Sequence, residues 1–197
     1  RVVGVDRQRI DAVEATDDRA HVETVRGDVT EESTREALAA AVDGGAGAVV
    51  SDVAPNMTGE YSVDHARSVH LARTALGVAL DVLDPGGDFV VKAFDGSDLD
   101  ALRDEVDEEF EYVRDVRPDA SRDSSSELYL VAKHRLTAPV REGDTVEVDI
   151  VDVGDEGDGI AKVEGFTLFV SGVEAGETVT VRVDDVKPQY GFAQPVE

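Results

Sequence analysis

Residues 66–94 read ARSVHLARTALGVALDVLDPGGDFVVKAF, and they contain the clearest change of local structure in the chain. Their first part repeats apolar residues at steps of three and four, which is the period of a helix that is buried on one side. Pro85 and the two glycines after it end that helix, because proline lacks an amide donor and clashes with the preceding turn. Residues 88–94 then form an almost continuously apolar run, typical of a buried strand. This helix-then-strand unit predicts an α/β domain.

The same alternation covers the first 133 residues. Near-continuous apolar strands joined by helices indicate a Rossmann-like α/β domain, with a parallel sheet covered by helices on both faces. The last two strands have no helix between them, which predicts an antiparallel pair at one edge. The expected strands are residues 2–5, 22–25, 48–53, 88–94, 111–116 and 127–133, and the expected helices are residues 31–42, 66–83 and 98–109.

The pattern of apolar and polar residues changes at residue 136. Short strand-like runs follow, separated by turns rich in glycine, aspartate and glutamate, and none shows helical spacing. This pattern predicts a small all-β, OB-like barrel. We therefore expect two domains, residues 1–135 and 136–197. The expected barrel strands are residues 145–151, 159–163, 167–170, 178–186 and 192–196.

The composition restricts the class of protein. The chain has 197 residues and a net charge of −25, yet 41% of the residues are hydrophobic, which is too many for a disordered acidic chain. No run reaches the roughly 18 apolar residues of a membrane span. The absence of cysteine excludes disulfides, thiolate metal sites and a cysteine nucleophile. We expect a soluble, cytoplasmic protein with no membrane and no obligatory protein partner.

The acidic excess indicates adaptation to salt and says little about the substrate. Only four of the 19 basic residues are lysine, and the acids are spread along the chain. At molar salt the Debye length is about 3 Å, so neighbouring like charges barely interact. Such a surface is typical of a halophilic protein. The acidic run at residues 152–158 lacks the spacing of a calcium-binding loop, and we expect no metal site.

Three of the expected strands end in an acidic residue, namely Asp6, Asp28 and Asp52. Ligands of open α/β sheets bind outside the carboxyl ends of the strands. An acid at these positions can accept hydrogen bonds from ribose hydroxyls or from an adenine amino group. Any single one of them is more readily explained as a cap of the following helix. Three in succession favour a nucleoside cofactor.

Two further charged residues lie in apolar strands. Lys92 interrupts the run 88–94, and lysine is rarely buried without a reason. It either extends its amine to solvent from the strand end or, if desolvated, has a lowered pKa that suits a general base. Glu127 begins the last strand of the domain, where an exposed strand glutamate is the ordinary interpretation.

The motifs SDVAPNMTG (51–59), LDPGGDFVVKAF (83–94) and RPDASRDSSSELYLVA (117–132) resemble the FtsJ/RrmJ-like family of ribosomal RNA 2′-O-ribose methyltransferases. The resemblance implies methyl transfer from S-adenosylmethionine to a ribose hydroxyl. It also implies ribosomal RNA or the large ribosomal subunit as the partner, with a uridine of 23S RNA as the expected target. In that family a Lys-Asp-Lys-Glu tetrad surrounds the hydroxyl. Asp52, Lys92 and Glu127 match three of its members, and Asp6, Asp28 and Asp52 match the acidic cofactor contacts.

The chain departs from the family pattern at its first residues. The family's first lysine and its glycine-rich cofactor loop have no match in this sequence, and we expect both to lie upstream of Arg1. The α/β domain is therefore expected to be incomplete at its N-terminus, without its first strand. On this interpretation the chain binds S-adenosylmethionine weakly or not at all.

The second domain resembles a TRAM domain, a small barrel attached to several RNA-modifying enzymes. The resemblance rests on glycine-containing motifs such as GDGIAKV (157–163), GFTLFV (165–170) and YGFA (190–193). Its aromatic residues can stack on bases, although aromatics in a small barrel are more often core. We expect at most one or two of them to be exposed. The aromatics are Phe166, Phe169, Tyr190 and Phe192, and the nearby cations are Lys162, Arg182 and Lys187.

Three alternatives remain beside ribosomal RNA methylation. The first domain could be inactive, which would leave an RNA-binding TRAM module, or the substrate could be transfer RNA. A nucleotide-binding oxidoreductase is the weakest alternative, because the sequence contains no G-x-G-x-x-G loop.

Overall fold

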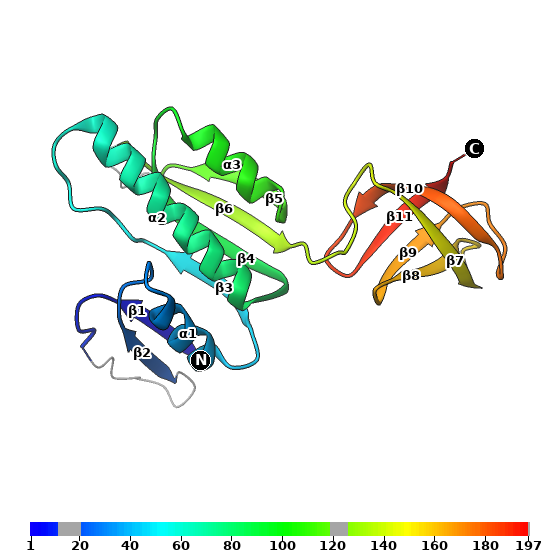
Figure 1. The fold of residues 1–197 in the computed structure, drawn as a ribbon, viewed down its shortest axis with the longest axis horizontal. Coiled ribbons are helices and arrows are strands. Elements are labelled where there is room, and N and C mark those ends of the chain that lie inside the picture. Colours follow the sequence, from blue (N-terminus) through cyan, green and yellow to red (C-terminus); the bar gives the residue numbers. More distant parts are fainter. Residues whose placement is uncertain (12–20, 119–125, 197) are drawn as a thin grey trace.

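The computed structural model describes residues 1–11, 21–118 and 126–196, which form two domains (Figure 1). The α/β domain contains β1 (Val2–Asp6), β2 (Val22–Arg26), α1 (Glu32–Val42), β3 (Ala46–Ser51), α2 (Tyr61–Val82), β4 (Leu83–Phe94), α3 (Leu99–Asp107), β5 (Phe110–Val116) and β6 (Glu127–Arg135). The second domain contains β7 (Thr145–Val153), β8 (Gly159–Val163), β9 (Phe166–Val170), β10 (Thr178–Val186) and β11 (Tyr190–Pro195). None of the described helices is long and apolar enough to cross a membrane.

The strands of the α/β domain form two sheets instead of the single sheet expected from the sequence. Strands β1 and β2 pair in parallel, and β3-β4-β6-β5 form a separate four-stranded sheet. Within the larger sheet β3 and β4 are parallel, whereas β6 pairs antiparallel with both β4 and β5. The predicted antiparallel pair is therefore confirmed, and β6 lies inside the sheet with β5 at its edge.

The long helix α2 packs on the larger sheet through the apolar face predicted by its period. Val69, Ala72 and Ala79 are at most 2% exposed and belong to one core cluster with Phe89 and Leu102. The helix begins at Tyr61, earlier than expected, and ends at Val82, directly before the predicted stop. The residues of that stop, 84–87, lie at the irregular start of β4 and do not form a separate turn.

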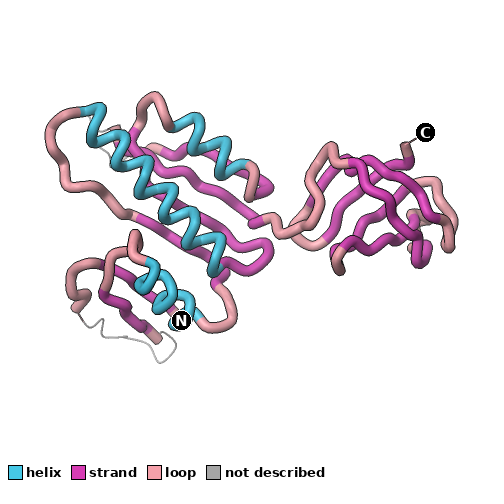
Figure 2. Tube along the Cα trace, in the orientation of Figure 1, coloured by secondary structure: helices cyan, strands magenta, loops and turns pink. Residues whose placement is uncertain are grey.

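Helices cover one face of the larger sheet, not both (Figure 2). Phe89, Val91 and Ala93 of β4 are at most 1% exposed, whereas the alternate residues Val90 and Lys92 point to the other face and are not fully buried. In β6, Leu128, Leu130 and Ala132 are likewise buried, while the residues between them are not. The described helices therefore leave accessible the face that carries Lys92. The expectation of helices on both faces is wrong for the described residues.

The second domain is a closed barrel in the order β10-β11-β9-β8-β7. Each of the five expected strands is confirmed, with boundaries that shift by two residues at most. Its core is aliphatic and separate from that of the α/β domain. The fully buried side chains include Leu168, Val170, Val181 and Val183.

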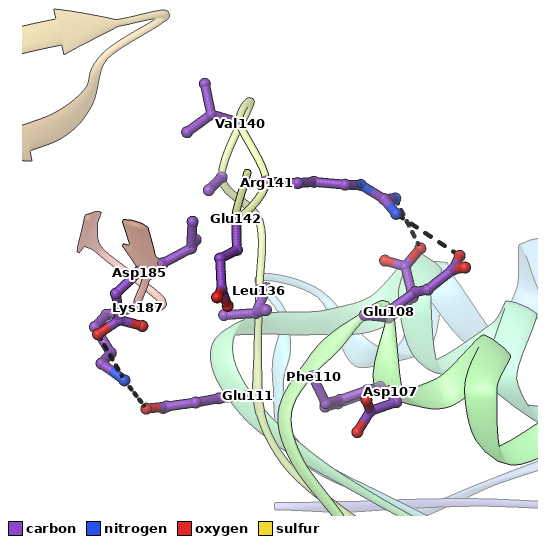
Figure 3. Close-up of a pocket in the computed structure, with 13 residues that line it drawn as sticks. Asp107, Glu108, Phe110, Glu111, Leu136, Val140, Arg141, Glu142, Asp185 and Lys187 are labelled. Atoms are coloured by element: carbon purple, nitrogen blue, oxygen red, sulfur yellow. Dashed lines mark hydrogen bonds and ion pairs between the residues drawn. The ribbon is translucent and has the colours of Figure 1, made fainter. Parts of the chain in front are cut away.

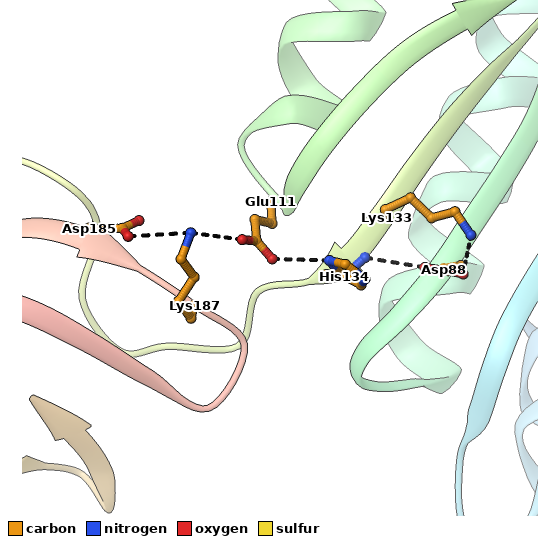
Figure 4. A network of polar contacts seen from close by, with 6 residues as sticks. All are labelled: Asp88, Glu111, Lys133, His134, Asp185 and Lys187. Carbon is orange, nitrogen blue, oxygen red and sulfur yellow. Dashed lines mark hydrogen bonds and ion pairs between the residues drawn. The ribbon is translucent and has the colours of Figure 1, made fainter.

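Polar contacts join the barrel to the α/β domain (Figure 4). Lys187 Nζ lies 2.8 Å from Glu111 Oε1 on β5 and 3.3 Å from Asp185. Glu111 also contacts His134 Nδ1 at 3.0 Å. Hydrogen bonds from Lys187 and His134, with the charges of both, hold the pKa of Glu111 below its usual value, although burial opposes them. A charged network thus links β10, β5 and the end of β6.

An acid-rich cavity of about 410 Å³ lies at the same junction (Figure 3). Its lining comes from the end of α3, the start of β5, the linker and the end of β10. Arg141 lies across it, 3.7 Å from Glu108 and 3.8 Å from Glu109. Of the residues that the sequence analysis assigned to catalysis or cofactor binding, none lines this cavity, whereas Lys187, one of the cations expected near the aromatics, does.

Candidate active site

Lys92 and Asp52 form an ion pair on the accessible face of the larger sheet. Lys92 lies near the carboxyl end of β4, and Asp52 directly follows β3, its parallel neighbour. The Lys92 Nζ and Asp52 Oδ1 atoms are 2.9 Å apart. The Lys92 side chain is 11% exposed, so its amine is largely withdrawn from water and paired with an accessible carboxylate.

Tyr129 is a third member of this group that the sequence reasoning missed. Its hydroxyl donates to the same Asp52 Oδ1 at 2.9 Å. Tyr129 is the direct partner of Lys92 in the β4–β6 ladder, and directly opposed residues place their side chains on one face. The hydrogen bond to Asp52, burial and the charges of Asp52 and Glu127 raise the pKa of Tyr129, which keeps it a donor.

The contacts of Asp52 favour its charged form. Burial by itself would raise the pKa of Asp52, but the hydrogen bonds from Lys92 and Tyr129, together with the charge of Lys92, hold it below its usual value. An ionised carboxylate is an acceptor only, so it can hold both donors at once. Asp52 therefore fixes the positions of an amine and a hydroxyl.

Glu127 lies on the same face of the sheet, diagonally across from Lys92. It pairs with Phe94 in the ladder, two residues beyond the Lys92–Tyr129 pair, and residues two apart in a strand share a face. Its negative charge contributes to the raised pKa of Tyr129. We refer to Asp52, Lys92, Glu127 and Tyr129 as the β4–β6 cluster. Residues 119–125 of the motif 117–132 lie outside the described residues.

Asp6 and Asp28 lie at the ends of the smaller sheet. Asp6 Oδ1 accepts a hydrogen bond from the Gln8 amide at 2.7 Å, and Asp28 Oδ1 accepts from the amide and the hydroxyl of Thr30. These are local bonds within the loops, and neither caps a described helix, because α1 begins at Glu32 without a side-chain cap hydrogen bond. The hydrogen bonds from Thr30 lower the pKa of Asp28, although burial opposes them and the charge of Arg7 assists. Among the described residues, no hydrogen bond or ion pair joins either acid to Lys92.

The carboxyl ends of β1 and β2 lie next to each other and to a cavity. Arg7 Nε lies 3.3 Å from Asp28 Oδ2, so the loops that follow the two parallel strands are linked. A cavity of about 300 Å³ opens beside them, between residues 8–10 and residues 24–26. Asp6 is exposed, and an ionised carboxylate has acceptor sites beyond one backbone bond. Acceptors next to a cavity suit ribose hydroxyls and an adenine amino group.

Two residues at the start of α2 hold the loops that flank the cluster. Asp64, which is 3% exposed, accepts hydrogen bonds from the amides of Thr58 and Gly59 and from the Thr58 hydroxyl. His65 bonds the Phe94 carbonyl through Nδ1 and accepts the Asp98 amide at Nε2. The residues after β3 and after β4 are thus tied to one helix end. The helical spacing of the sequence gives no indication of a role for Asp64 or His65.

Replacing Asp64 by alanine is expected to release the 51–59 loop. The hydrogen bonds from the Thr58 and Gly59 backbone amides and from the Thr58 hydroxyl lower the pKa of Asp64, assisted by the charge of Arg67 and opposed by burial. Its contribution is therefore present at neutral pH and is lost as the pH falls through the lowered value. We expect a melting temperature lower by several degrees at pH 7, with faster amide exchange at Thr58 and Gly59. Unchanged exchange at these two amides would contradict this role.

The described residues contain no group of three or more histidine, aspartate or glutamate side chains arranged to hold a metal ion.

The chain matches known sequence families in both domains. Residues 1–135 match the family described as FtsJ-like methyltransferase, and residues 139–196 match the TRAM domain. A protein of Haloarcula marismortui named ribosomal RNA large subunit methyltransferase E is 66% identical, over 100% of this chain and 76% of its own length. A protein of the same name from Natronomonas pharaonis is 65% identical, over 100% of this chain and 75% of its own.

A crystal structure of a Plasmodium falciparum protein, described as a putative ribosomal RNA methyltransferase, shares the fold. It superposes with a TM-score of 0.58 at 21% identity and covers 68% of this chain and 71% of its own.

Proposed function

The chain belongs to the FtsJ-like methyltransferase family, and on that premise we propose that it transfers a methyl group from S-adenosylmethionine to a ribose 2′-hydroxyl of large-subunit ribosomal RNA. The reaction class follows from the family. The substrate follows from the names of the two halophile relatives. The observation that carries the proposal is the ion pair of Lys92 with Asp52 at 2.9 Å, on the same sheet face as Glu127.

The reaction needs alignment and the removal of one proton. S-adenosylmethionine, when bound, supplies a methyl group that is already activated by a sulfonium. The ribose oxygen forms a bond to the methyl carbon while the carbon–sulfur bond breaks and its electron pair stays on sulfur. The hydroxyl proton must leave the oxygen late in this step. Positioning and general base catalysis are therefore the tasks of the protein.

The β4–β6 cluster supplies groups for both tasks. Lys92, which is an ammonium in its ion pair with Asp52, first loses one proton to solvent; the neutral amine then takes the hydroxyl proton and becomes an ammonium again. Asp52 stabilises that ammonium, because its carboxylate already lies 2.9 Å from Nζ. Glu127 accepts a hydrogen bond that orients the ribose hydroxyl. Tyr129 holds Asp52 and does not contact the substrate.

Asp6 and Asp28 would hold the nucleoside part of the cofactor. Both follow parallel strands, beside the cavity at residues 8–10. Asp6 would accept from the ribose hydroxyls and Asp28 from the adenine amino group, while Asp52 would adjoin the reacting end. Because the proposed substrate is ribosomal RNA, we place the reaction in the cytoplasm.

The experiment that tests this function measures the product nucleoside. The protein is incubated with methyl-labelled S-adenosylmethionine and 23S ribosomal RNA in about 2 M KCl, which screens its acidic surface. The RNA is digested to nucleosides for mass spectrometry. We expect label in a 2′-O-methylated nucleoside. Label in a base would refute the assignment, and preferential labelling of transfer RNA in a parallel reaction would replace the substrate.

Replacing Tyr129 by phenylalanine is expected to slow methyl transfer by about 10- to 100-fold, the effect of losing one hydrogen bond to a charged group. Asp52 then loses one of the donors that lower its pKa, so the acid limb of the pH–rate profile should move to higher pH. KM for RNA should stay unchanged, because Tyr129 acts through Asp52. A raised KM with an unmoved acid limb would mean that Tyr129 contacts the RNA instead.

A further inference from the structure

Tyr61 is an exposed aromatic residue at the edge of the candidate active site. It is the first residue of α2, at the end of the loop that begins with Asp52, and it is 62% exposed. Its hydroxyl donates a hydrogen bond to the Asp95 carbonyl at 2.5 Å. Asp95 directly follows β4, the strand that carries Lys92. Tyr61 therefore bridges the loops that follow β3 and β4.

The ring of Tyr61 is held in place without being buried. It lies nearly parallel to the His65 ring, with 10° between the planes and 6.3 Å between the centroids. His65 is 3% exposed and is fixed by its bonds to Phe94 and Asp98. A Cβ on Gly96 would lie 2.5 Å from His65 Nδ1, so the loop after β4 packs directly on this histidine. The Tyr61 ring thus has a fixed support, while most of its surface stays in water.

The fold does not use the Tyr61 ring to fill its core. The buried cluster of the α/β domain consists of other residues, and α2 contributes to it from Val69 onward. Met57, in the loop that leads to Tyr61, is also exposed, at 64%. Ligands of open α/β sheets bind at the loops that follow the strands. A fixed and exposed ring at this place is therefore suited to contact a ligand.

The anchor at Asp95 determines where that ligand lies. Asp95 is three residues beyond Lys92, which corresponds to about 10 Å along an extended strand. The Asp95 amide bonds the Ser126 carbonyl at 2.7 Å, directly before Glu127, so the β4–β6 pairing continues to this point. The ring thus lies next to the β4–β6 cluster, beyond the hydroxyl that meets Lys92. In Figure 1 the start of α2 lies at the end of the α/β domain that is remote from the barrel.

We propose that the Tyr61 ring stacks on a base of the substrate RNA beside the target ribose and so positions that ribose for methyl transfer. The inference rests on the proposed function, since it takes ribosomal RNA as the substrate. Bases of any identity stack on aromatic rings, and molar salt does not screen this contact as it screens charges. A small misplacement of the ribose oxygen costs rate, so a fixed platform contributes to kcat as well as to binding.

The charges around the ring are compatible with an RNA strand. Arg117 at the end of β5 neutralises Asp95, because its Nη2 atom lies 2.6 Å from Asp95 Oδ2. Glu60 and Asp98 are exposed acids nearby in the chain, and molar salt screens their repulsion of phosphate. A flat ring between the two loops of a site that acts on RNA matches a nucleobase better than it matches a protein side chain.

Three variants of the full protein separate the ring from its anchor. Tyr61→Ala removes both, and Tyr61→Phe keeps the ring but removes the hydroxyl that bonds Asp95. The chain contains no tryptophan, so Tyr61→Trp introduces a single fluorescent reporter and keeps an aromatic ring. Tyr112→Ala is the matched control, since Tyr112 is a 51% exposed aromatic residue on β5. Melting curves establish that each variant is folded.

The first measurement is methyl transfer to 23S ribosomal RNA in about 2 M KCl. We expect kcat/KM of Tyr61→Ala to fall about tenfold or more, as expected for the loss of one stacked base. Tyr61→Phe should keep KM within about twofold and lower kcat by about two- to tenfold, because it loses only one hydrogen bond. The Tyr112→Ala control should be unchanged. Equal losses in the alanine and phenylalanine variants would show that the ring does not stack, and would overturn the proposal.

The second measurement does not depend on methylation. The probes are an oligouridylate of about eight nucleotides and an abasic ribose-phosphate chain of the same length. We expect the oligouridylate to quench the Tyr61→Trp fluorescence and the abasic chain to leave it unchanged. Equal responses to both probes would overturn the proposal.

The two measurements together separate this inference from the proposed function. Methylation by Tyr61→Ala with an unchanged kcat/KM would remove Tyr61 from substrate positioning and leave the proposed function intact. Absence of ribose methylation by the unmodified protein, with quenching by the oligouridylate alone, would refute the function and keep Tyr61 as a base-binding residue.

Discussion

Replacing Lys92 by alanine is expected to lower kcat for methyl transfer by about 10²- to 10⁴-fold, the usual contribution of a general base. The amine is the group of the β4–β6 cluster that can take the ribose proton, and its side chain is only 11% exposed. Alanine leaves the alternate buried residues of β4 in place, so the fold should persist. RNA affinity should stay nearly unchanged, because Lys92 acts on one hydroxyl.

The chain offers a matched control for this substitution. Lys133 bonds Asp88 at 2.5 Å across the same β4–β6 pair of strands, so Lys133→Ala also removes a lysine from a lysine–aspartate pair. This second variant should keep full transfer activity. A comparable loss in both variants would indicate damage to the sheet. Full activity of Lys92→Ala would remove Lys92 from the mechanism.

Replacing Asp52 by asparagine is expected to lower kcat by about 10²- to 10³-fold, the size of effect seen when a preorganised electrostatic partner is lost. The amide keeps the shape of the side chain but loses the negative charge that stabilises the Lys92 ammonium. The same charge is lost in the unmodified protein when Asp52 is protonated. Because its contacts hold the pKa of Asp52 below the usual value, the contribution of Asp52 to the rate should be lost only as the pH drops through that lowered value.

Asp88→Asn is the control for this variant, since Asp88 carries the corresponding charge beside Lys133. Burial by itself would raise the pKa of Asp88, but hydrogen bonds from Lys133 and the His134 amide, together with the charges of both residues, hold it below its usual value. Both carboxylates are therefore charged at neutral pH, and the two variants remove the same charge. We expect the rate to fall only with Asp52→Asn. An acid limb that persists unmoved in Asp52→Asn would show that another group produces it.

The elements of both domains were predictable because each has a regular period. The apolar face of α2 and the five barrel strands followed from spacing alone, with small shifts at their ends. The antiparallel pairing of β5 and β6 followed from the absence of a helix between them. These features depend on neighbours in sequence, which is the information that a period contains.

The remaining features depend on contacts between distant residues. The division into two sheets depends on which strands hydrogen-bond to each other. The alternation of apolar and polar residues within a strand does not predict its neighbours. Tyr129 joins the site because it lies directly opposite Lys92 in the antiparallel β4–β6 pair. Knowledge of that strand register would have identified it, but the sequence pattern alone does not give the register. Asp64 holds the loop after β3 through hydrogen bonds to Thr58 and Gly59, and the irregular backbone of that loop has no sequence period that predicts them. The outward position of Phe169, Tyr190 and Phe192 required the pairing of β9 with β11.

The most direct test of the convergence of Lys92 and Asp52 on one reaction is a double-mutant cycle. The measurement is kcat for methyl transfer by the unmodified protein, Lys92→Ala, Asp52→Asn and the double variant. Because Asp52 is proposed to act through the Lys92 ammonium, the double variant should be no slower than Lys92→Ala within about twofold, since residues that act as a unit are not additive. If the two losses multiply in the double variant, Asp52 and Lys92 act independently and the proposed site is wrong.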